Sequence, residues 1–469
     1  MKLRKFYGRI LEEINIESAG AEGNCIARWD GKVVFVKNAV PGDVCDLRII
    51  GKKKKFFIAE IAKIHTKGPD RIEPFCAHFG NCGGCKWQQM DYQGQLTFKT
   101  QQVRDALDRI GKLDYENVPM ALGSEHTTYY RNKMEYSYSH SRWLTKDQLN
   151  AEEFIEETGL GFHVPQRFDK IVHIDKCWLQ DDLGNQIRNW CYQYAKDNNL
   201  SFYDARRQEG LLRNLMLRNN RKGEWMVLQT FRYNEREVIH AMMGAMQKKF
   251  PQIVSLLFSV NEKVNDSMYD LDIELYYGNP LITESLEDLT FQVRPKSFFQ
   301  TNPTQAELLY KTALDFAGLT GNELVYDLYC GTGTISLFLA RNAKKVLGIE
   351  SVPQAIEDAN ENAVLNNITN CEFIVGDMKD ELNDSFTSKH GNPDVIVTDP
   401  PRAGMHTDVI DQILKLRPEK VVYVSCNPAT QARDLDLMRE VYQIEKIQPV
   451  DMFPHTHHVE NVVLLIRKD

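Results

Sequence analysis

The regular alternation of apolar strands and helix-like segments after about residue 291 constrains this 469-residue chain more than any other feature. Such alternation is typical of a parallel sheet with helices on both faces, in which ligands bind at the carboxyl ends of the strands. We therefore expect an α/β doubly wound domain over residues 291–469. Its expected strands are ELVYDLYCG, KKVLGIE, CEFIVGD, PDVIVTDPP and KVVYVSCNP, with YQIEKIQPV and NVVLLIRKD completing the sheet.

A glycine-rich turn joins the first of these strands to its helix, in the segment Asp327–Thr334 (DLYCGTGT). Gly331 and Gly333 allow a ligand to approach the backbone, and the free N–H groups of the helix N-terminus can bind it. Glu350 ends the second strand, where a carboxylate can bind ribose hydroxyls, and Asp377 ends the third, near the expected adenine. The third glycine of a dinucleotide fingerprint is missing, which favours a smaller adenosine cofactor. The combination resembles the class I S-adenosylmethionine-dependent methyltransferases, whose fold is Rossmann-like.

A thiol and a carboxylate follow later in the same domain. Cys426 ends the expected strand KVVYVSCNP, and Glu460 precedes the last apolar strand. Alone, a cysteine is most often part of the buried packing and a glutamate most often lies at the surface. Beside a methyl donor, however, the pair can methylate uracil. A thiolate adds to C6 and makes C5 nucleophilic, and a base then removes the C5 proton.

Five segments, in this order and spacing, resemble the RNA uracil-C5 methyltransferases: FFQTN, DLYCGTGT, DPPRAGM, VSCNP and HHVEN. The resemblance implies that Cys426 is the nucleophile and Glu460 the proton acceptor. It also implies that S-adenosylmethionine is bound by Gln300, Tyr329, Thr334, Glu350, Asp377 and Asp399. Many relatives have Asn in place of Thr334 and Phe in place of Tyr329; a hydroxyl and an aromatic ring can make similar contacts.

The first 67 residues differ from the rest in charge and pattern. They hold 14 Lys and Arg against 8 Asp and Glu, a net charge of +6, although the whole chain carries −8. Short alternating strands separated by turns predict a small β-barrel, and the basic excess suits a nucleic acid. The segment resembles a TRAM domain, an OB-like RNA-binding barrel. Residues 68–74 form the expected linker, and residues 75–290 an α+β central domain.

Three cysteines gather within ten residues, at Cys76, Cys82 and Cys85, in a glycine-rich segment that could wrap a metal. Cys177 is the expected fourth ligand. Four thiolates suit an iron–sulfur cluster or zinc equally, and thiols without a metal are a further alternative. The family resemblance implies a [4Fe-4S] cluster that folds the central domain and helps hold RNA. By the same resemblance, these cysteines favour rRNA enzymes over the tRNA branch.

The sequence thus predicts S-adenosylmethionine-dependent methylation of a uridine at C5 in 23S rRNA. The uridine would be flipped out of a hairpin, with Phe298, Phe299 and Arg402 as candidates for contacting the base. The alternatives are a tRNA uridine-C5 methyltransferase, an amino methyltransferase of adenine or cytosine, and a non-catalytic RNA-binding assembly factor. Arg402 and Cys426 argue against the amino methyltransferase. We expect a cytoplasmic monomer that makes no membrane contact, because no apolar run approaches about eighteen residues.

Overall fold

The computed structural model describes residues 6–150, 157–165 and 167–469. The chain divides into two compact units, each formed by segments that are distant in sequence. The first unit comprises Met1–Phe75, Cys85–Glu125 and Gln305–Asp469, and the second comprises Cys76–Gly84 and His126–Thr304. No helix of the described residues is long and apolar enough to cross a membrane.

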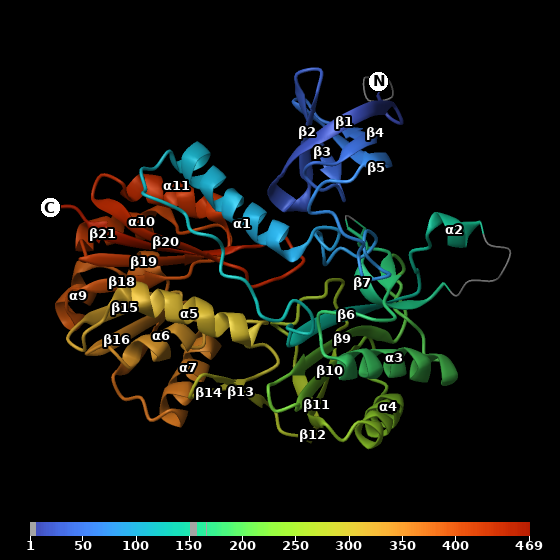
Figure 1. Cartoon of the computed structure of the whole chain (residues 1–469). Helices are drawn as coiled ribbons and strands as arrows, with labels where there is room; N and C mark the ends of the chain where they lie inside the picture. Colours follow the sequence, from blue (N-terminus) through green and yellow to red (C-terminus); the bar gives the residue numbers. More distant parts are fainter. Residues whose placement is uncertain (1–5, 151–156, 166) are drawn as a thin grey trace. The chain divides into compact units, whose positions relative to one another are not determined.

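A closed five-stranded barrel begins the first unit (Figure 1). Its elements are β1 (Ile10–Ala19), the 3₁₀ turn η1 (Ala21–Gly23), β2 (Cys25–Trp29), β3 (Lys32–Lys37), β4 (Val44–Lys52) and β5 (Phe56–Thr66). The strands pair in the order β1-β2-β3-β5-β4, with β3 and β5 parallel. Val34 and Val36 of β3 are buried and alternate with more exposed neighbours, as a barrel wall requires. The predicted barrel is confirmed.

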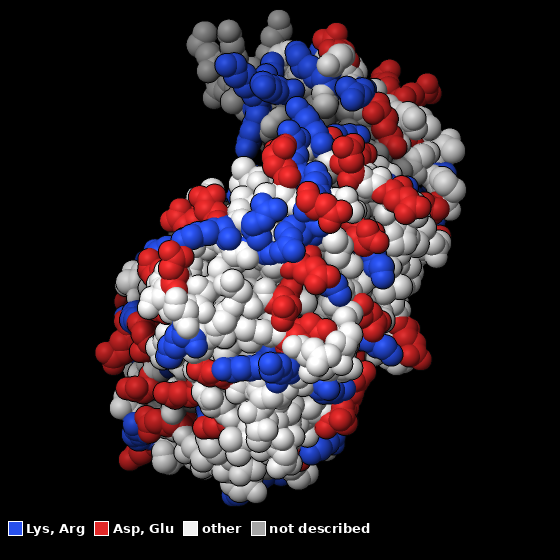
Figure 2. Space-filling view, turned by 90° about the vertical axis from the view of Figure 1, so that its left-hand side faces the viewer, with Lys and Arg blue, Asp and Glu red and all other residues white. Residues whose placement is uncertain are grey.

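Basic side chains gather over the barrel, at the top of the view in Figure 2. The Nζ atom of Lys52 lies 4.0 Å from the ring centroid of Phe6, and the guanidinium of Arg9 lies 4.8 Å from that of Trp29. These cations stack on aromatic faces, whereas Lys54 and Lys55 of the same lysine run extend into solvent. The surface of the barrel therefore carries cations that stack on aromatic rings and cations that are exposed to solvent.

A seven-stranded sheet forms the C-terminal part of the first unit. Its strands are β15 (Leu324–Leu328), β16 (Lys345–Glu350), β17 (Cys371–Val375), β18 (Val395–Thr398), β19 (Lys420–Ser425), β20 (Tyr442–Val450) and β21 (Glu460–Arg467). Their order is β17-β16-β15-β18-β19-β21-β20. The first five are parallel, and β21 runs antiparallel between β19 and β20. This is the predicted doubly wound sheet.

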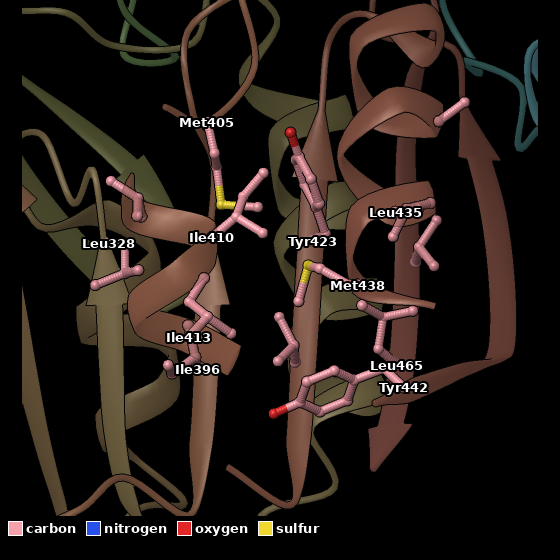
Figure 3. Packing of buried hydrophobic residues seen from close by; sticks show 14 of the residues in the cluster. Leu328, Ile396, Met405, Ile410, Ile413, Tyr423, Leu435, Met438, Tyr442 and Leu465 are labelled. Carbon is pink, nitrogen blue, oxygen red and sulfur yellow. The ribbon is translucent and has the colours of Figure 1, made fainter. Parts of the chain in front are cut away.

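Helices cover both faces of this sheet. They are α5 (Pro303–Ala317), α6 (Thr334–Ala340), α7 (Pro353–Leu365), α8 (Met378–Glu381), α9 (Asp384–His390), α10 (Thr407–Leu416) and α11 (Pro428–Met438). Figure 3 shows part of the core, where Ile396 and Tyr423 of the sheet meet Ile413 of α10 and Leu435 of α11. All four side chains are at most 2% exposed. The hydrophobic effect of these contacts fixes the strand ends relative to one another.

A segment from before the central region packs into the same unit. Helix α1 (Tyr92–Ala106) continues into a π-helical turn η2 (Leu107–Gly111), and it lies beside α11 and β20 (Figure 1). Leu122 forms an isolated parallel bridge with Val450 at the end of β20. Residues 85–125, which the sequence grouped with the central region, thus belong to the unit that contains the C-terminal sheet.

The second unit contains a seven-stranded sheet in the order β12-β11-β10-β9-β6-β7-β8 and a separate β13–β14 hairpin. The strands are β6 (Lys133–Ser139), β7 (Gly159–His163), β8 (Ile171–His173), β9 (Leu212–Asn219), β10 (Trp225–Phe231), β11 (Ile253–Val260), β12 (Ile273–Gly278), β13 (Ile282–Leu286) and β14 (Leu289–Val293). The helices are α2 (Lys146–Leu149), α3 (Asp182–Asp197) and α4 (Arg236–Lys249). The mixture of strands and helices is the α+β architecture expected of the central region.

A buried ion pair closes the barrel where the linker leaves it. The side chains of Asp43 and Arg71 are 0% and 9% exposed, and two hydrogen bonds of 2.6 and 2.8 Å join them. The backbone N–H groups of Val40 and Gly68 also donate to Asp43. Burial acts to raise the pKa of Asp43, but the hydrogen bonds from Arg71, Gly68 and Val40 outweigh it and hold the pKa below its usual range.

We expect Asp43→Asn to destabilise the barrel by about 3 kcal/mol, because it leaves the buried Arg71 guanidinium without a counter-charge. Urea unfolding followed by tryptophan fluorescence would measure this, since Trp87 is fully buried in the barrel core. The matched control is Glu60→Gln, which removes an exposed ion pair with Arg48 and should cost less than about 1 kcal/mol. Equal effects of the two substitutions would contradict a structural role for the buried pair.

Candidate active site

The predicted site residues follow consecutive strands of the C-terminal sheet. Tyr329 follows β15, Glu350 ends β16, Asp377 lies just beyond β17, Asp399 follows β18 and Cys426 follows β19. Because these five strands are parallel, their carboxyl ends lie along one edge of the sheet. The sheet therefore gathers residues that are up to 97 positions apart in the sequence, from Tyr329 to Cys426.

The loop between β15 and α6 has left-handed backbone at Tyr329 (φ 65°), Gly331 (φ 54°) and Gly333 (φ 79°). A Cβ atom added at Gly331 would meet no atom within 4 Å, so the loop faces open space there. The N–H of Gly331 donates to Oε2 of Glu350 at 3.3 Å. The loop and the carboxylate thus border space suited to a ligand that binds backbone and hydroxyl groups.

Asp327 was absent from the residues predicted for the site, but its environment marks it. It is the one acid within the apolar strand β15 and is fully buried. Ser336 donates to Oδ2 at 2.5 Å, whereas Oδ1 accepts no hydrogen bond from the described residues. Burial raises the pKa of Asp327 to about 7, and Asp399 and Glu350 act in the same direction. A buried acceptor without a donor suits the approach of a polar ligand.

The remaining predicted cofactor residues differ in their surroundings. Thr334 begins α6, and its hydroxyl donates to the hydroxyl of Tyr310 at 3.4 Å. Asp377 caps α8 by accepting a hydrogen bond from the N–H of Lys379. Burial raises the pKa of Tyr329, and the charge of Asp377 adds to this effect. Gln300 is buried but belongs to the second unit. Its predicted contact with the cofactor therefore stays a prediction.

The pairing of β19 with β21 places Glu460 across from Cys426. Ser425, the last residue of β19, pairs with Asn461 of the antiparallel β21. Cys426, which follows Ser425, therefore lies opposite Glu460, which precedes Asn461. The side chain of Asn461 donates to Gln431 of α11 at 2.7 Å, and Gln431 donates to the carbonyl oxygens of Tyr423 and Asn461. This bond network holds the register between the two strands.

Buried acids and one arginine determine the protonation of this pair. Burial, reinforced by Asp399, raises the pKa of Glu460 to about 8. Burial, reinforced by Glu460 and Asp399, raises the pKa of Cys426 to about 11. Arg402 lowers both values. Asp399 is partly buried, and desolvation raises its pKa to about 7. In a free site near neutral pH, the thiol and the carboxyl therefore both hold protons.

The loop that carries Arg402 is fixed to the start of α11. Asn427 and Thr430 donate to the carbonyl oxygen of Arg402, at 3.0 and 3.2 Å. These hydrogen bonds hold Arg402, which lies between β18 and α10, close to the segment that contains Cys426. Phe298 is 71% exposed and Phe299 is 5% exposed, with the ring of Phe299 against Phe291. Of the two phenylalanines, only Phe298 is available to a base.

The cysteines predicted to bind a cluster do not all belong to one unit. Cys76, Cys82 and Cys177 lie in the second unit, and Cys85 lies in the first. Burial raises the pKa of Cys76, and the charge of Cys177 contributes in the same direction. Across the described residues, no group of three or more His, Cys, Asp or Glu side chains is arranged to hold a metal ion. The predicted cluster thus receives no support from this geometry.

The chain is similar to known proteins over most of its length. Residues 278–468 match the family described as tRNA (Uracil-5-)-methyltransferase, and residues 7–62 match the TRAM domain. An uncharacterized RNA methyltransferase of Bacteroides thetaiotaomicron is 52% identical over 95% of this chain and 99% of its own length. An uncharacterized RNA methyltransferase of Porphyromonas gingivalis is 50% identical over 97% of this chain and 99% of its own length.

A solved structure is similar over nearly the whole chain. It is the Pyrococcus abyssi tRNA (uracil-54, C5)-methyltransferase in complex with S-adenosyl-L-homocysteine. The TM-score is 0.74, with 27% identity, and the match covers 97% of this chain and 100% of the other.

The raised pKa of Glu460 predicts a pH-dependent gain in stability for Glu460→Gln. The pKa of the Glu460 carboxyl is higher in the folded than in the unfolded state. Its contribution to the stability of the fold is therefore complete below the unfolded-state pKa and is lost as the pH rises through the folded-state pKa of about 8. At pH 9 the variant should be more stable than the wild type by about 2 kcal/mol or more, a difference that shrinks by pH 5. Urea unfolding at both pH values measures it. Glu445→Gln, at an exposed position of β20, is the control; a gain independent of pH would contradict the assignment.

Proposed function

This chain belongs to the tRNA (uracil-5-)-methyltransferase family of S-adenosylmethionine-dependent RNA methyltransferases, and from that premise we propose that it methylates C5 of a uridine in 23S rRNA. The observation that supports the chemistry most strongly is the strand register that sets the Glu460 carboxyl across from the Cys426 thiol. C5 substitution needs a nucleophile that reaches C6 and a base that reaches the adjacent C5, so the two groups must lie near each other.

In the proposed reaction, the Cys426 thiolate adds to C6 of the uracil and forms a C6–S bond. The added electron pair makes C5 nucleophilic. Bound S-adenosylmethionine would supply the methyl group as an electrophile: its S–CH₃ bond breaks as the C5–CH₃ bond forms, and the thioether S-adenosylhomocysteine leaves. Glu460 then accepts the C5 proton, the C5=C6 double bond re-forms, and the C6–S bond breaks. Arg402 assists by favouring the ionised forms of both groups, since its charge lowers the pKa of each.

The residues present fit the methyl donor. Gly331 fronts open space, Glu350 holds its carboxylate at the edge of that space, and Asp327 offers an acceptor oxygen. We propose that these residues, with Tyr329 and Asp377, would hold the adenosine part of S-adenosylmethionine. We propose that Thr334, Asp399 and Gln300 also contact S-adenosylmethionine.

RNA is the proposed partner because the barrel resembles a TRAM domain and residues 1–67 carry a net charge of +6, although the whole chain carries −8. A uridine within a helix hides C5 and C6 in the stack, so it must be flipped out before Cys426 can reach it. The choice of rRNA depends on the four cysteines, Cys76, Cys82, Cys85 and Cys177. The similarity to a tRNA (uracil-54, C5)-methyltransferase favours tRNA as the second candidate.

The proposal predicts the release of tritium from RNA labelled at uracil C5, because the C5 proton leaves when the methyl group is installed. Separate incubations with 23S rRNA and with tRNA, each with S-adenosylmethionine, would be counted for tritium in water. We expect release from rRNA. Release from tRNA alone would support C5 methylation but contradict 23S rRNA as the substrate. No release from either RNA would contradict C5 methylation.

The matched control for the mechanism is a pair of cysteine variants. Cys426→Ala should lose both methyl transfer and tritium release, at least about a thousandfold, as expected when a covalent nucleophile is removed. Cys371→Ala, which changes a half-buried cysteine at the start of β17, should keep both. Full methyl transfer by Cys426→Ala would contradict the covalent route.

We also propose that Cys76, Cys82, Cys85 and Cys177 bind a [4Fe-4S] cluster. The support is chemical: four thiolates are the ligand set of such clusters, and glycines at positions 80, 83 and 84 leave the loop free to wrap. The segment around Cys177 is held firmly, because its N–H donates to Asn185 at 2.7 Å and its carbonyl oxygen accepts from the same side chain. The cluster would support the fold and RNA binding, with no part in the methyl transfer.

Protein purified without oxygen should then contain about four iron atoms and four sulfides per chain. Cys85→Ser and Cys177→Ser should lose iron and bind RNA more weakly, whereas Cys371→Ser should behave as the wild type. Iron and sulfide analysis with RNA filter binding would measure these effects. Zinc in place of iron, or Cys85→Ser with unchanged fold and RNA affinity, would contradict the cluster.

A further inference from the structure

One face of α1 is polar although it is turned toward the protein. Its residues Tyr92, Gln95, Lys99 and Gln102 are spaced three, four and three apart, which places them along one side of a helix. Gln95 and Lys99 are 0% exposed. A helix normally turns apolar side chains inward, so buried amide and ammonium groups need specific partners.

Each of the four side chains has a hydrogen-bond partner in one segment, residues 451–459, between β20 and β21. Outside the segment, Gln95 also donates to the carbonyl oxygens of Trp87 and Met90, and the Tyr92 hydroxyl accepts from Ser124. The Tyr92 hydroxyl donates to Asp451 at 2.9 Å, and Lys99 donates to Asp451 at 2.5 Å. Lys99 also donates to the carbonyl oxygen of Phe453 at 3.0 Å. The side chains of Lys99 and Asp451 are both fully buried.

Further along the segment, the backbone is held at two more points. The N–H of His455, a residue with left-handed φ of 65°, donates to Gln95 at 2.8 Å. Gln102 donates to the carbonyl oxygen of His457 at 3.3 Å. Side chains of α1 thus bind the segment from its first residue to within three positions of Glu460.

The segment leaves and rejoins the sheet at a single step of the ladder, because Val450 pairs with Glu460. Glu460 is therefore fixed from one side by the pairing of β21 and from the other by the segment that α1 holds. Cys426 is held by a different set of hydrogen bonds, since Asn427 is bound to the loop of Arg402 and caps α11. A loss of contact between α1 and the segment should displace the base more than the nucleophile.

We propose that the polar face of α1 positions Glu460 for removal of the C5 proton, with Lys99 and Gln102 as positioning residues for that step. This inference depends on the proposed C5 methylation. If it holds, weakening the face slows transfer of the C5 proton to the Glu460 carboxylate. The C5=C6 double bond then re-forms late, and the methylated base stays joined to Cys426 through the C6–S bond.

The test counts two isotopes on the RNA that the wild type modifies: tritium leaving C5 and carbon-14 arriving with the methyl group. The wild type should give one tritium per methyl at all times. Gln102→Ala should release tritium about three- to tenfold more slowly than it incorporates methyl in the first turnover, the effect expected from one lost hydrogen bond. A protein–RNA adduct resistant to detergent should accumulate, as it should with Glu460→Gln.

The matched control is Gln101→Ala. Gln101 is also half-buried on α1 but donates to Asp105 of the same helix, so its loss should leave the isotope ratio at one. The double variant Lys99→Met with Asp451→Asn removes the buried pair without leaving a lone charge, and it should delay tritium release by about tenfold or more. Gln102→Ala alone decides the question if the double variant fails to fold.

The outcomes separate the two proposals. No tritium release and no methyl transfer by the wild type would overturn the proposed function itself. An active wild type whose Gln102→Ala variant keeps a ratio of one and forms no adduct would overturn the positioning role. Equal losses of both isotopes in the variants would also overturn it, since that result indicates general damage to the fold.

Discussion

The antiparallel pairing of β21 with β19 is the constraint on which the site depends. It brings Glu460 across from Cys426, although 34 positions of sequence separate them, and does so by backbone hydrogen bonds that depend little on side chains. The Gln431 amide, bonded to backbone on both strands, prevents a shift of register. A shift of the strand pairing by one residue would turn the Glu460 side chain to the other face of the sheet, away from Cys426.

The parallel part of the sheet contributes a second property, a concentration of acids at one edge. Asp327 and Glu460 are buried there and Asp399 is partly buried. Desolvation raises the pKa of all three, and neighbouring acids add to the effect for Asp327 and Glu460. The positive charge of Arg402 lowers the pKa of Glu460 and of Cys426 and so partly offsets the effect of burial. A base that is protonated in the free site, yet close to a guanidinium, can ionise once an incoming ligand changes its surroundings.

The sequence predicted the barrel, the doubly wound sheet and the methyltransferase family, because strand periodicity and strand-end motifs are local signals. It did not predict the place of α1. The buried side of that helix mixes Gln95 and Lys99 with Leu96, Val103 and Ala106, so no purely apolar stripe indicates which partner it meets. The sequence does not single out Asp327, because one acid in an apolar strand gives no sign of its burial. The position of Gln300 relative to the other cofactor residues depends on how the units meet, which no motif encodes.

The order of the strands has a consequence for how such a chain matures during synthesis. In the sheet β20 lies outside β21, yet it precedes β21 in the chain, so it emerges from the ribosome before the strand that joins it to the sheet. Until β21 inserts, β20 has no ladder neighbour in the described sheet, and the nucleophile has no base across from it. Completion of the fold and arrival of the base are therefore a single event. A nascent chain with a finished cofactor pocket would bind its cofactor while still unable to complete the removal of a proton from RNA.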